Sequence, residues 1–226
     1  MNRKLYLRGY YKLIIFVKKY YVMKNYLKTL LISGLIGGSM MGMVSCDKQS
    51  NEDMKSENAV IECIMSRKSV RLFENREVGN DTIEKILKAG MAAPTAINSQ
   101  PWKFVVLRDK NLLKTLADTM PNTRTQTATV AIVVCGDMTK ALEGVAKEFW
   151  VQDCSAATEN ILLAAHSMGL GAVWTGFYPN MDKANYLNDL LGLEERYVPL
   201  CVIPIGYPAE DPEVKDKWKP ENVIYK

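Results

Sequence analysis

Histidine is nearly absent from this chain of 226 residues, which contains one, His166. With one histidine and no Cys-x-x-Cys pair, the chain lacks the ligands of a typical zinc site. A Ser-His-Asp triad is not expected either, because no serine lies at motif spacing from a histidine. His166 is therefore interpreted as a structural residue of a helix. The sequence also lacks a Gly-x-Gly-x-x-Gly motif after a strand, which leaves a Rossmann nicotinamide site without support.

Acidic residues are missing from the first 45 positions, which hold eight of the 29 Lys and Arg residues. The rest of the chain has 21 basic and 25 acidic residues, a net charge of about −4. A nucleic-acid partner is not expected, because binding a polyanion requires a basic surface on the folded domain.

The first 45 residues are typical of an export signal. Residues 23–28 are basic, residues 29–44 carry no charge, and Ser45 precedes Cys46. This ending resembles a bacterial lipoprotein signal with Met23 as the start, in which Cys46 is lipidated and anchors the protein to the membrane of the cell envelope. The alternatives are an uncleaved membrane anchor, although the uncharged run is shorter than the roughly 20 residues a span needs, and a cytoplasmic protein.

The domain organisation follows from this leader. Residues 1–45 form the signal segment, residues 46–58 are polar and predict a flexible tether, and residues 59–226 form one domain. The four remaining cysteines (Cys63, Cys135, Cys154 and Cys201) are widely spaced and are expected to be structural thiols. Disulfides stay open, because an envelope location permits them.

Helical and strand patterns alternate along the domain, which predicts an α+β fold. Apolar spacing indicates helices over 59–66, 81–89 (capped by Asp81), 111–118, 147–168 (with Phe149 on its apolar side) and 182–191. Strands are expected over 103–107, 129–135, 171–175 and 199–205. Residues 211–226 are charged and interrupted by proline, and we expect them to lie along another surface.

A cationic segment, residues 67–71, follows the first of these helices. Arg67, Lys68, Ser69 and Arg71 place three cations and a hydroxyl within five residues, a donor set that suits a phosphate ester. The alternative is a solvated basic turn.

An amide loop, residues 94–100, joins a helix to a strand that begins near Trp102. Asn98 and Gln100 follow the small residues Pro94, Thr95 and Ala96, so a flat ring can approach the backbone while the amides meet its polar edge. A simple polar turn is the alternative. Gly176, at the end of a later strand, can expose its backbone to the same ligand.

Taken together, these segments resemble the nitroreductase family of flavin enzymes. Residues 67–71 are similar to its Arg-Arg-Ser-x-Arg signature, and residues 93–102 to its Ala-Pro-Ser/Thr-x-x-Asn-x-Gln-Pro-Trp loop. Residues 169–176 and 205–208 match two later landmarks in the same order. The resemblance implies a nitroreductase-like fold, with a mostly antiparallel sheet flanked by helices. It also implies an intertwined homodimer that binds FMN without a covalent bond at its interface.

The resemblance also implies roles for individual residues. Arg67, Lys68 and Ser69 hold the phosphate and ribityl chain, joined by Lys217 where the family often has arginine, and Arg71 faces the pyrimidine edge of the ring. The amide loop comes from the partner subunit and contributes Pro94, Thr95, Ala96, Asn98 and Gln100. Trp174, Thr175 and Gly176 lie near flavin N5, and no side chain is catalytic.

The implied activity is that of an FMN-dependent oxidoreductase. A hydride passes from NAD(P)H through FMN to a flat, electron-poor acceptor, such as a nitro compound or a quinone, by a ping-pong mechanism. The alternatives are a flavin-binding or scaffold lipoprotein without turnover, and a reductive dehalogenase of the same fold. The export signal conflicts with a nicotinamide donor, because NAD(P)H is not expected outside the cytoplasm. Either residues 1–45 are not an export signal, or the reductant is a different one.

Overall fold

The computed structural model of the protein describes residues 58–226. The predicted signal segment, Cys46 and nearly all of the predicted tether lie outside these residues. In the part that is described, no helix combines the length and the apolar character needed to cross a bilayer.

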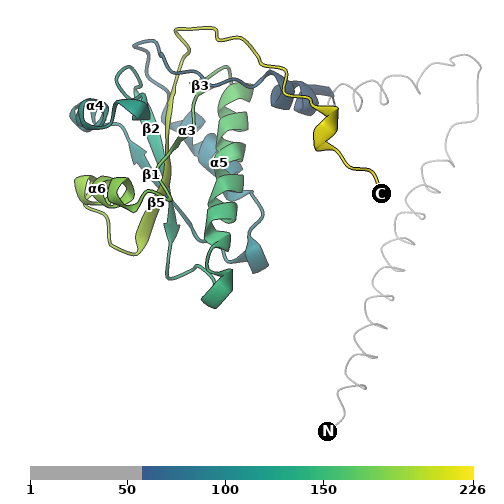
Figure 1. Cartoon of the computed structure of the whole chain (residues 1–226). Coiled ribbons are helices and arrows are strands. Elements are labelled where there is room, and N and C mark those ends of the chain that lie inside the picture. Colours follow the sequence, from purple (N-terminus) through teal and green to yellow (C-terminus); the bar gives the residue numbers. More distant parts are fainter. Residues whose placement is uncertain (1–57) are drawn as a thin grey trace, which may run out of the picture. The chain divides into compact units, whose positions relative to one another are not determined.

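A central antiparallel sheet organises the domain (Figure 1). Its strands are β1 (Trp102–Leu107), β2 (Val130–Asp137), β3 (Gly171–Ala172), β4 (Thr175–Gly176) and β5 (Tyr197–Gly206). They lie in the order β1, β2, β5, β3, and β4 also pairs with β5. Every strand pair is antiparallel. The predicted α+β class and the mostly antiparallel sheet are confirmed.

Helices cover both faces of this sheet. Helices α3 (Asn80–Met91) and α5 (Phe149–Ser167) pack on one face, where they share a core with Ile132 and Ile203. Helices α4 (Lys110–Thr119) and α6 (Met181–Leu191) pack on the other, against Val133 and Val202. Both faces are covered, so every residue of β2 is buried. This agrees with the continuous apolar run of residues 130–135.

The helix ends follow their local sequences. The Asp109 carboxylate accepts a hydrogen bond from Leu112 N at 2.7 Å and caps α4, and Asn180 caps α6 through Lys183 N at 3.0 Å. Helix α3 begins after Gly79 without a side-chain cap, so the predicted capping role of Asp81 is wrong. Asp81 lies in the first turn of α3, where its charge meets the positive end of the helix dipole.

Two other expectations need correction. The strand predicted over 171–175 is interrupted, because Val173 and Trp174 leave the ladder between β3 and β4. Its register against β5 is unchanged across the break, with Ala172 opposite Ile205 and Thr175 opposite Val202. Phe149, expected on the buried side of α5, is 42% exposed because it begins the helix, before the sheet covers it.

The remaining elements are single 3-10 turns: η1 (Ala96–Asn98), η2 (Pro121–Thr123), η3 (Gly144–Ala146) and η4 (Pro220–Asn222). Residues 58–66 are helical and precede the cationic segment. After β5 the chain has no helix or strand except η4, as its charged, proline-interrupted sequence predicts. This tail passes beside helix 58–66 (Figure 1), and residues of both line one cleft.

Candidate functional site

The cationic segment is held against the edge of the sheet beside β3. Val70 N donates to Ala172 O at 3.0 Å, and Ser69 forms an isolated parallel bridge with Ala172. Gly171 permits this contact, because a Cβ atom there would lie 2.6 Å from Val70 Cγ1. The buried Val70 thus anchors a backbone whose other side chains remain accessible.

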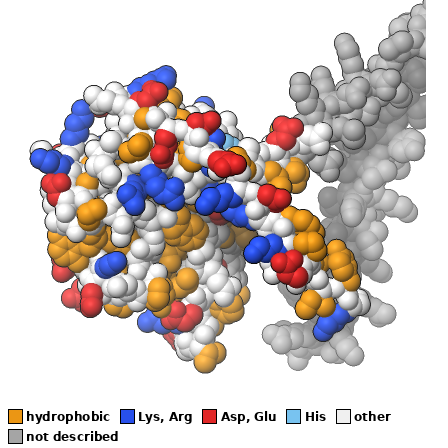
Figure 2. Space-filling model, turned by 45° about the horizontal axis from the view of Figure 1, so that its top comes forward, with side chains coloured by type: hydrophobic (Ala, Val, Ile, Leu, Met, Phe, Trp, Pro, Cys, Tyr) orange, Lys and Arg blue, Asp and Glu red, His pale blue; other side chains and the backbone are white. Residues whose placement is uncertain are grey.

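The predicted phosphate ligands line one cleft with the C-terminal tail. The cleft has a volume of about 670 Å³ and includes Arg67, Lys68, Ser69 and Arg71 on one side and Lys217 on the other. Basic and acidic side chains are intermixed on this face of the domain (Figure 2). The structure therefore brings Lys217 to the cationic segment, although nearly 150 residues separate them in sequence.

Carboxylates partner the cations in this cleft. Lys68 pairs with Asp211, and Arg67 Nε lies 3.4 Å from Glu159 Oε1 on α5. Glu210 Oε1 accepts hydrogen bonds from the backbone nitrogens of Arg71 and Leu72, at 2.5 and 3.2 Å. The cleft thus gathers cations that suit an anion, and two of them, Arg67 and Lys68, are paired with carboxylates of the same chain.

His166 lies next to this site, a position that its sequence context did not indicate. Its Nε2 atom is 2.8 Å from Ser66 Oγ, immediately before the cationic segment. Burial lowers the pKa of His166, and repulsion from Arg67 and Lys68 lowers it further. No spacing in the sequence could have revealed this contact, because it joins the end of α5 to a helix 100 residues earlier.

The amide loop has an unusual backbone. Ile97, Asn98 and Gln100 have φ angles of 48°, 60° and 49°, the left-handed region that side chains other than glycine rarely adopt. Gln100 N donates to Thr95 Oγ1 at 3.2 Å, and Gln100 Nε2 donates to Asn98 Oδ1 at 3.1 Å. Backbone strain of this kind concentrates at ligand sites. Pro94, Asn98 and Gln100 are exposed, so their surfaces are available to a ligand or a second chain.

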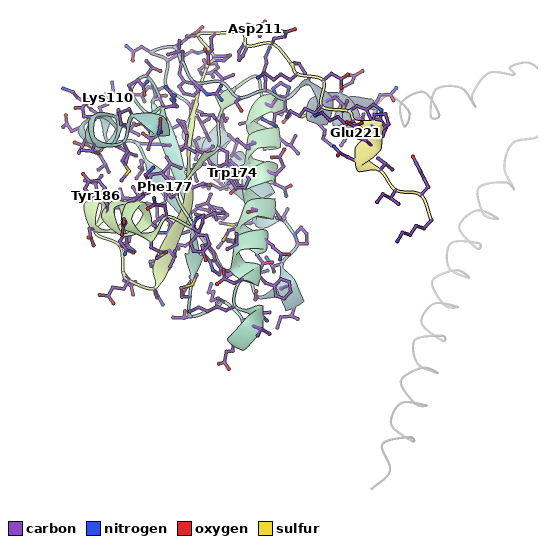
Figure 3. All side chains as sticks on the ribbon, viewed as in Figure 1. Lys110, Trp174, Phe177, Tyr186, Asp211 and Glu221 are labelled. Atoms are coloured by element: carbon purple, nitrogen blue, oxygen red, sulfur yellow. The ribbon has the colours of Figure 1, made fainter. Side chains whose placement is uncertain are left out.

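Residues around β4 form a third surface. Thr175 Oγ1 donates to Val202 O at 2.6 Å, so this side chain is hydrogen-bonded within the sheet. No atom lies within 4 Å of the position a Cβ would take at Gly176, which leaves open space beside it. Trp174 is 36% exposed, and Figure 3 shows it well separated from Asp211 at the start of the tail.

Within one chain, the cationic segment and the amide loop lie toward opposite ends of α5. His166 near the C-terminus of α5 contacts Ser66, whereas Asp153 near its N-terminus contacts the loop at Ala96. Thirteen residues of α-helix span about 20 Å. The two segments of one chain are therefore well separated, so a ring that contacts both, as the family resemblance implies, would need the amide loop of a second copy.

The chemistry of these residues fits FMN. Arginine, lysine and serine donors suit its phosphate, and side-chain amides offer both donors and acceptors to the polar edge of its ring. Ser99 Oγ is the one buried side-chain oxygen or nitrogen of residues 58–226 that lacks a hydrogen-bond partner, and it belongs to the amide loop. An unsatisfied polar atom at this place is consistent with a surface that is completed by another molecule.

Other chemistries find no support in residues 58–226. No group of three His, Cys, Asp or Glu residues there could hold a metal ion. The four described cysteines are unpaired, and burial raises the pKa of Cys135 and of Cys201 to about 12. Thiols so strongly protonated are poor nucleophiles, in agreement with the expected structural role.

Comparison with known proteins identifies the family. The sequence model of the nitroreductase family matches residues 64–123 and 117–207. The chain belongs to the nitroreductase family. A nitroreductase-family relative from Methanothermobacter thermautotrophicus, named as a candidate NADH dehydrogenase/NAD(P)H nitroreductase, is 44% identical over 169 residues. The match covers 74% of this chain and 87% of the relative.

Solved structures of nitroreductases agree with this assignment. A crystal structure from Bacteroides thetaiotaomicron, with the same candidate name, has a TM-score of 0.70 and 43% identity, and the match covers 74% of this chain and 97% of that one. An NADPH:FMN oxidoreductase from Vibrio harveyi, complexed with NAD+, has a TM-score of 0.67 and 27% identity, over 75% of this chain and 77% of that one. The predicted family, fold, enzyme class and cofactor class are confirmed, and the roles of individual site residues remain predictions.

Proposed function

We propose that the protein is an FMN-dependent oxidoreductase that moves a hydride from a reduced nicotinamide donor to a flat, electron-poor acceptor, such as a nitro compound or a quinone. The observation that carries this proposal is the cleft in which Arg67, Lys68, Ser69 and Lys217 converge, in a member of the nitroreductase family. When bound, FMN supplies hydride transfer at its N5 atom, chemistry for which proteins rely on cofactors.

The residues of the cleft bind the charged end of the cofactor. Arg67 offers two parallel donors to phosphate oxygens, and Lys68 and Lys217 add charge without that fixed geometry. Glu159 and Asp211 give up these cations when the phosphate enters. Because the exchange replaces one anion with another, these partly buried cations keep an anionic partner.

Other residues orient the ring and respond to its charge. Arg71 places a fixed cation at the pyrimidine edge, where negative charge accumulates on reduction, and so favours the reduced ring electrostatically. The amides of Asn98 and Gln100 hydrogen-bond its polar edge, and the backbone of Thr175 and Gly176 approaches the reacting side. Donor and acceptor then bind in turn at the same exposed face.

The active unit in this proposal is a homodimer. The amide loop of one subunit completes the site that the cationic segment of the other begins, because α5 holds the two apart within a chain. The tail, residues 211–226, lies along the partner and carries Lys217 to the phosphate. Several of its apolar side chains are well exposed in the single chain, Trp218 among them at 67%.

Spectroscopy of the purified full-length protein tests the function. We expect a yellow protein with one FMN per subunit, whose visible flavin absorbance is bleached by NADH or NADPH without oxygen and restored by a quinone or a nitroaromatic compound. A colourless protein that takes up no FMN contradicts the proposal and favours a scaffold lipoprotein. Bound FMN that no donor reduces also contradicts it and favours a flavin carrier.

We also propose that the protein is a lipoprotein of the cell envelope, anchored through Cys46. The support is the basic, then uncharged, then Ser45-Cys46 pattern of the leader. Radiolabelled palmitate should enter the wild-type protein and be lost in Cys46→Ala. Equal labelling of both, or none of either, contradicts the anchor and favours a cytoplasmic enzyme, for which NAD(P)H supply is ordinary.

A further inference from the structure

We infer that Asp153 is a positioning residue that holds the amide loop in the conformation that meets the flavin ring. Its Oδ1 atom accepts a hydrogen bond from Ala96 N at 2.9 Å, from a position on α5 that is 57 residues away in sequence. The inference rests on the proposed function, since contact between the loop and the ring is part of it.

Burying the Asp153 carboxylate is energetically unfavourable unless hydrogen bonds replace its hydration. The residue is 6% exposed on the sheet-facing side of α5. Within residues 58–226, no Lys, Arg or His nitrogen forms an ion pair with it. A buried carboxylate without a cation depends on hydrogen bonds for its solvation, and here a backbone N–H of the amide loop provides one.

The amide loop depends on this bond because its other hydrogen bonds are internal. Gln100 bonds to Thr95 and Asn98, and the backbone nitrogens of Asn98 and Ser99 bond to oxygens of residues 95 and 96. These bonds close the loop on itself. Among the hydrogen bonds of the described residues, the Ala96–Asp153 bond is the one that joins the loop's interior to another element.

The loop backbone needs such an external restraint. Ile97, Asn98 and Gln100 all have positive φ angles, and none is glycine. Conformations of this kind persist only where the surroundings determine them. Without Asp153, residues 96–100 can relax toward ordinary turn geometries, and Asn98 and Gln100 then no longer present their amides together. Asp153 therefore controls the ring's binding surface without touching the ring.

Flavin titrations of the full-length protein test this role. Asp153→Ala should raise the Kd for FMN about tenfold and raise the Kd for riboflavin, which lacks the phosphate, by the same factor. Asp153→Asn keeps an oxygen acceptor and should restore both affinities to within about threefold of wild type. At saturating FMN, the visible circular dichroism of the bound flavin should change in Asp153→Ala and be native in Asp153→Asn.

A matched control separates positioning from stability. Thr158→Ala removes a buried hydroxyl that lies five residues along α5 from Asp153, donates to Cys154 O and has no hydrogen bond to the loop. It should lower the melting temperature while leaving the flavin circular dichroism unchanged. The inference is overturned if Asp153→Ala binds flavin as wild type does, or if Thr158→Ala produces the same spectral change. Failure of the wild-type protein to bind FMN would instead overturn the proposed function.

Discussion

Arg67 has two roles in this account: it forms an ion pair with Glu159 in the folded chain, and it is a proposed ligand of the FMN phosphate. Its side chain is 18% exposed, and its Nε lies 3.4 Å from Glu159 Oε1, so the single chain already supplies a carboxylate partner. If Arg67 binds the FMN phosphate as proposed, the phosphate must compete with a carboxylate for this cation. The net strength of the site is the difference between the two interactions and is smaller than either alone.

Replacing Arg67 tests the phosphate site. Arg67→Ala should raise the Kd for FMN at least tenfold, because a charge-assisted hydrogen bond contributes about 1.5–3 kcal/mol. Arg67→Lys should lose less, since it keeps the charge but not the forked geometry. Riboflavin affinity should change little in either variant, and isothermal titration calorimetry measures both ligands. Arg196→Ala, which breaks an ion pair with Glu194 instead, is the control. Unchanged FMN affinity in Arg67→Ala contradicts the assignment.

His166 allows the electrostatics of the cleft to be measured directly, because it is the only histidine in the sequence. Burial and repulsion from Arg67 and Lys68 lower its pKa below the usual 6.5. In a tag-free protein, its ring signals should therefore titrate below pH 6.5 in NMR. Adding FMN should raise this pKa, since the phosphate offsets the repulsion, whereas riboflavin should not. A pKa at or above 6.5 without ligand would contradict the arrangement.

The same lowered pKa links His166 to stability. The unfolded chain binds the proton more tightly than the folded chain does, so the free energy of unfolding should decrease as pH falls below about 6.5. His166→Asn should remove this contribution. Between about pH 7 and 5, the free energy of unfolding measured with urea should then change less with pH than in the wild-type protein. An identical slope in both proteins would show that His166 does not contribute.

At the scale of elements, the site depends on how the cationic segment is fastened to β3. The segment is neither a helix nor a regular strand, and two features hold it: the bond from Val70 N to Ala172 O and the close contact of Val70 with Gly171. Gly206 provides a second such contact, with Phe73. These two glycines are required by packing, since neither has a positive φ angle.

Gly171→Ala tests this attachment. The added Cβ would lie 2.6 Å from Val70 Cγ1 and 2.7 Å from its Cβ, and only the second atom is fixed by the backbone. The substitution should push the cationic segment away from β3. It should lower the free energy of unfolding by about 1–3 kcal/mol and also weaken FMN binding. Gly79→Ala, with no atom within 4 Å of its added Cβ, should cost less and leave FMN affinity unchanged. Equal losses in the two variants would contradict this account.

At the scale of the whole molecule, the single chain presents surfaces that lack a counterpart. Apolar side chains are exposed on helix 58–66, including Ile61 and Met65, and on the tail, where Tyr225 is 90% exposed. Large exposed apolar patches usually mark interfaces. These exposed apolar side chains and the separation of the two halves of the site support a dimer in which the tail of each subunit lies along its partner.

Truncation after Glu210 tests the dimer. The shortened chain loses Lys217 and the exposed apolar residues of the tail, so it should elute as a monomer and retain little FMN. Size-exclusion chromatography with light scattering, together with flavin absorbance, measures both outcomes. Val145→Ser, which changes a fully exposed apolar residue outside helix 58–66 and the tail, should leave the dimer intact. A truncated chain that stays dimeric and yellow contradicts the proposed role of the tail.

Much of the architecture could be predicted because local sequence and local structure agree. The apolar run of β2 needs burial on both faces, and the pattern of α4 places its apolar residues on one side of a helix, so burial dictates these elements. The interruption between β3 and β4 was not predictable, because residues 171–175 have the pattern of one strand and both halves pair with β5 in the same register.

Residue types and their spacing were enough to predict a cationic segment suited to a phosphate, an amide loop, and no histidine or cysteine cluster. Which distant residues lie against these segments followed from the packing of the folded chain. It placed His166 and Lys217 at the cationic segment and Asp153 under the amide loop, and it set the two halves of the site toward opposite ends of α5. The physical reason is that motifs depend on residue type and short spacing, whereas these contacts arise from packing between segments that are 50 to about 150 residues apart.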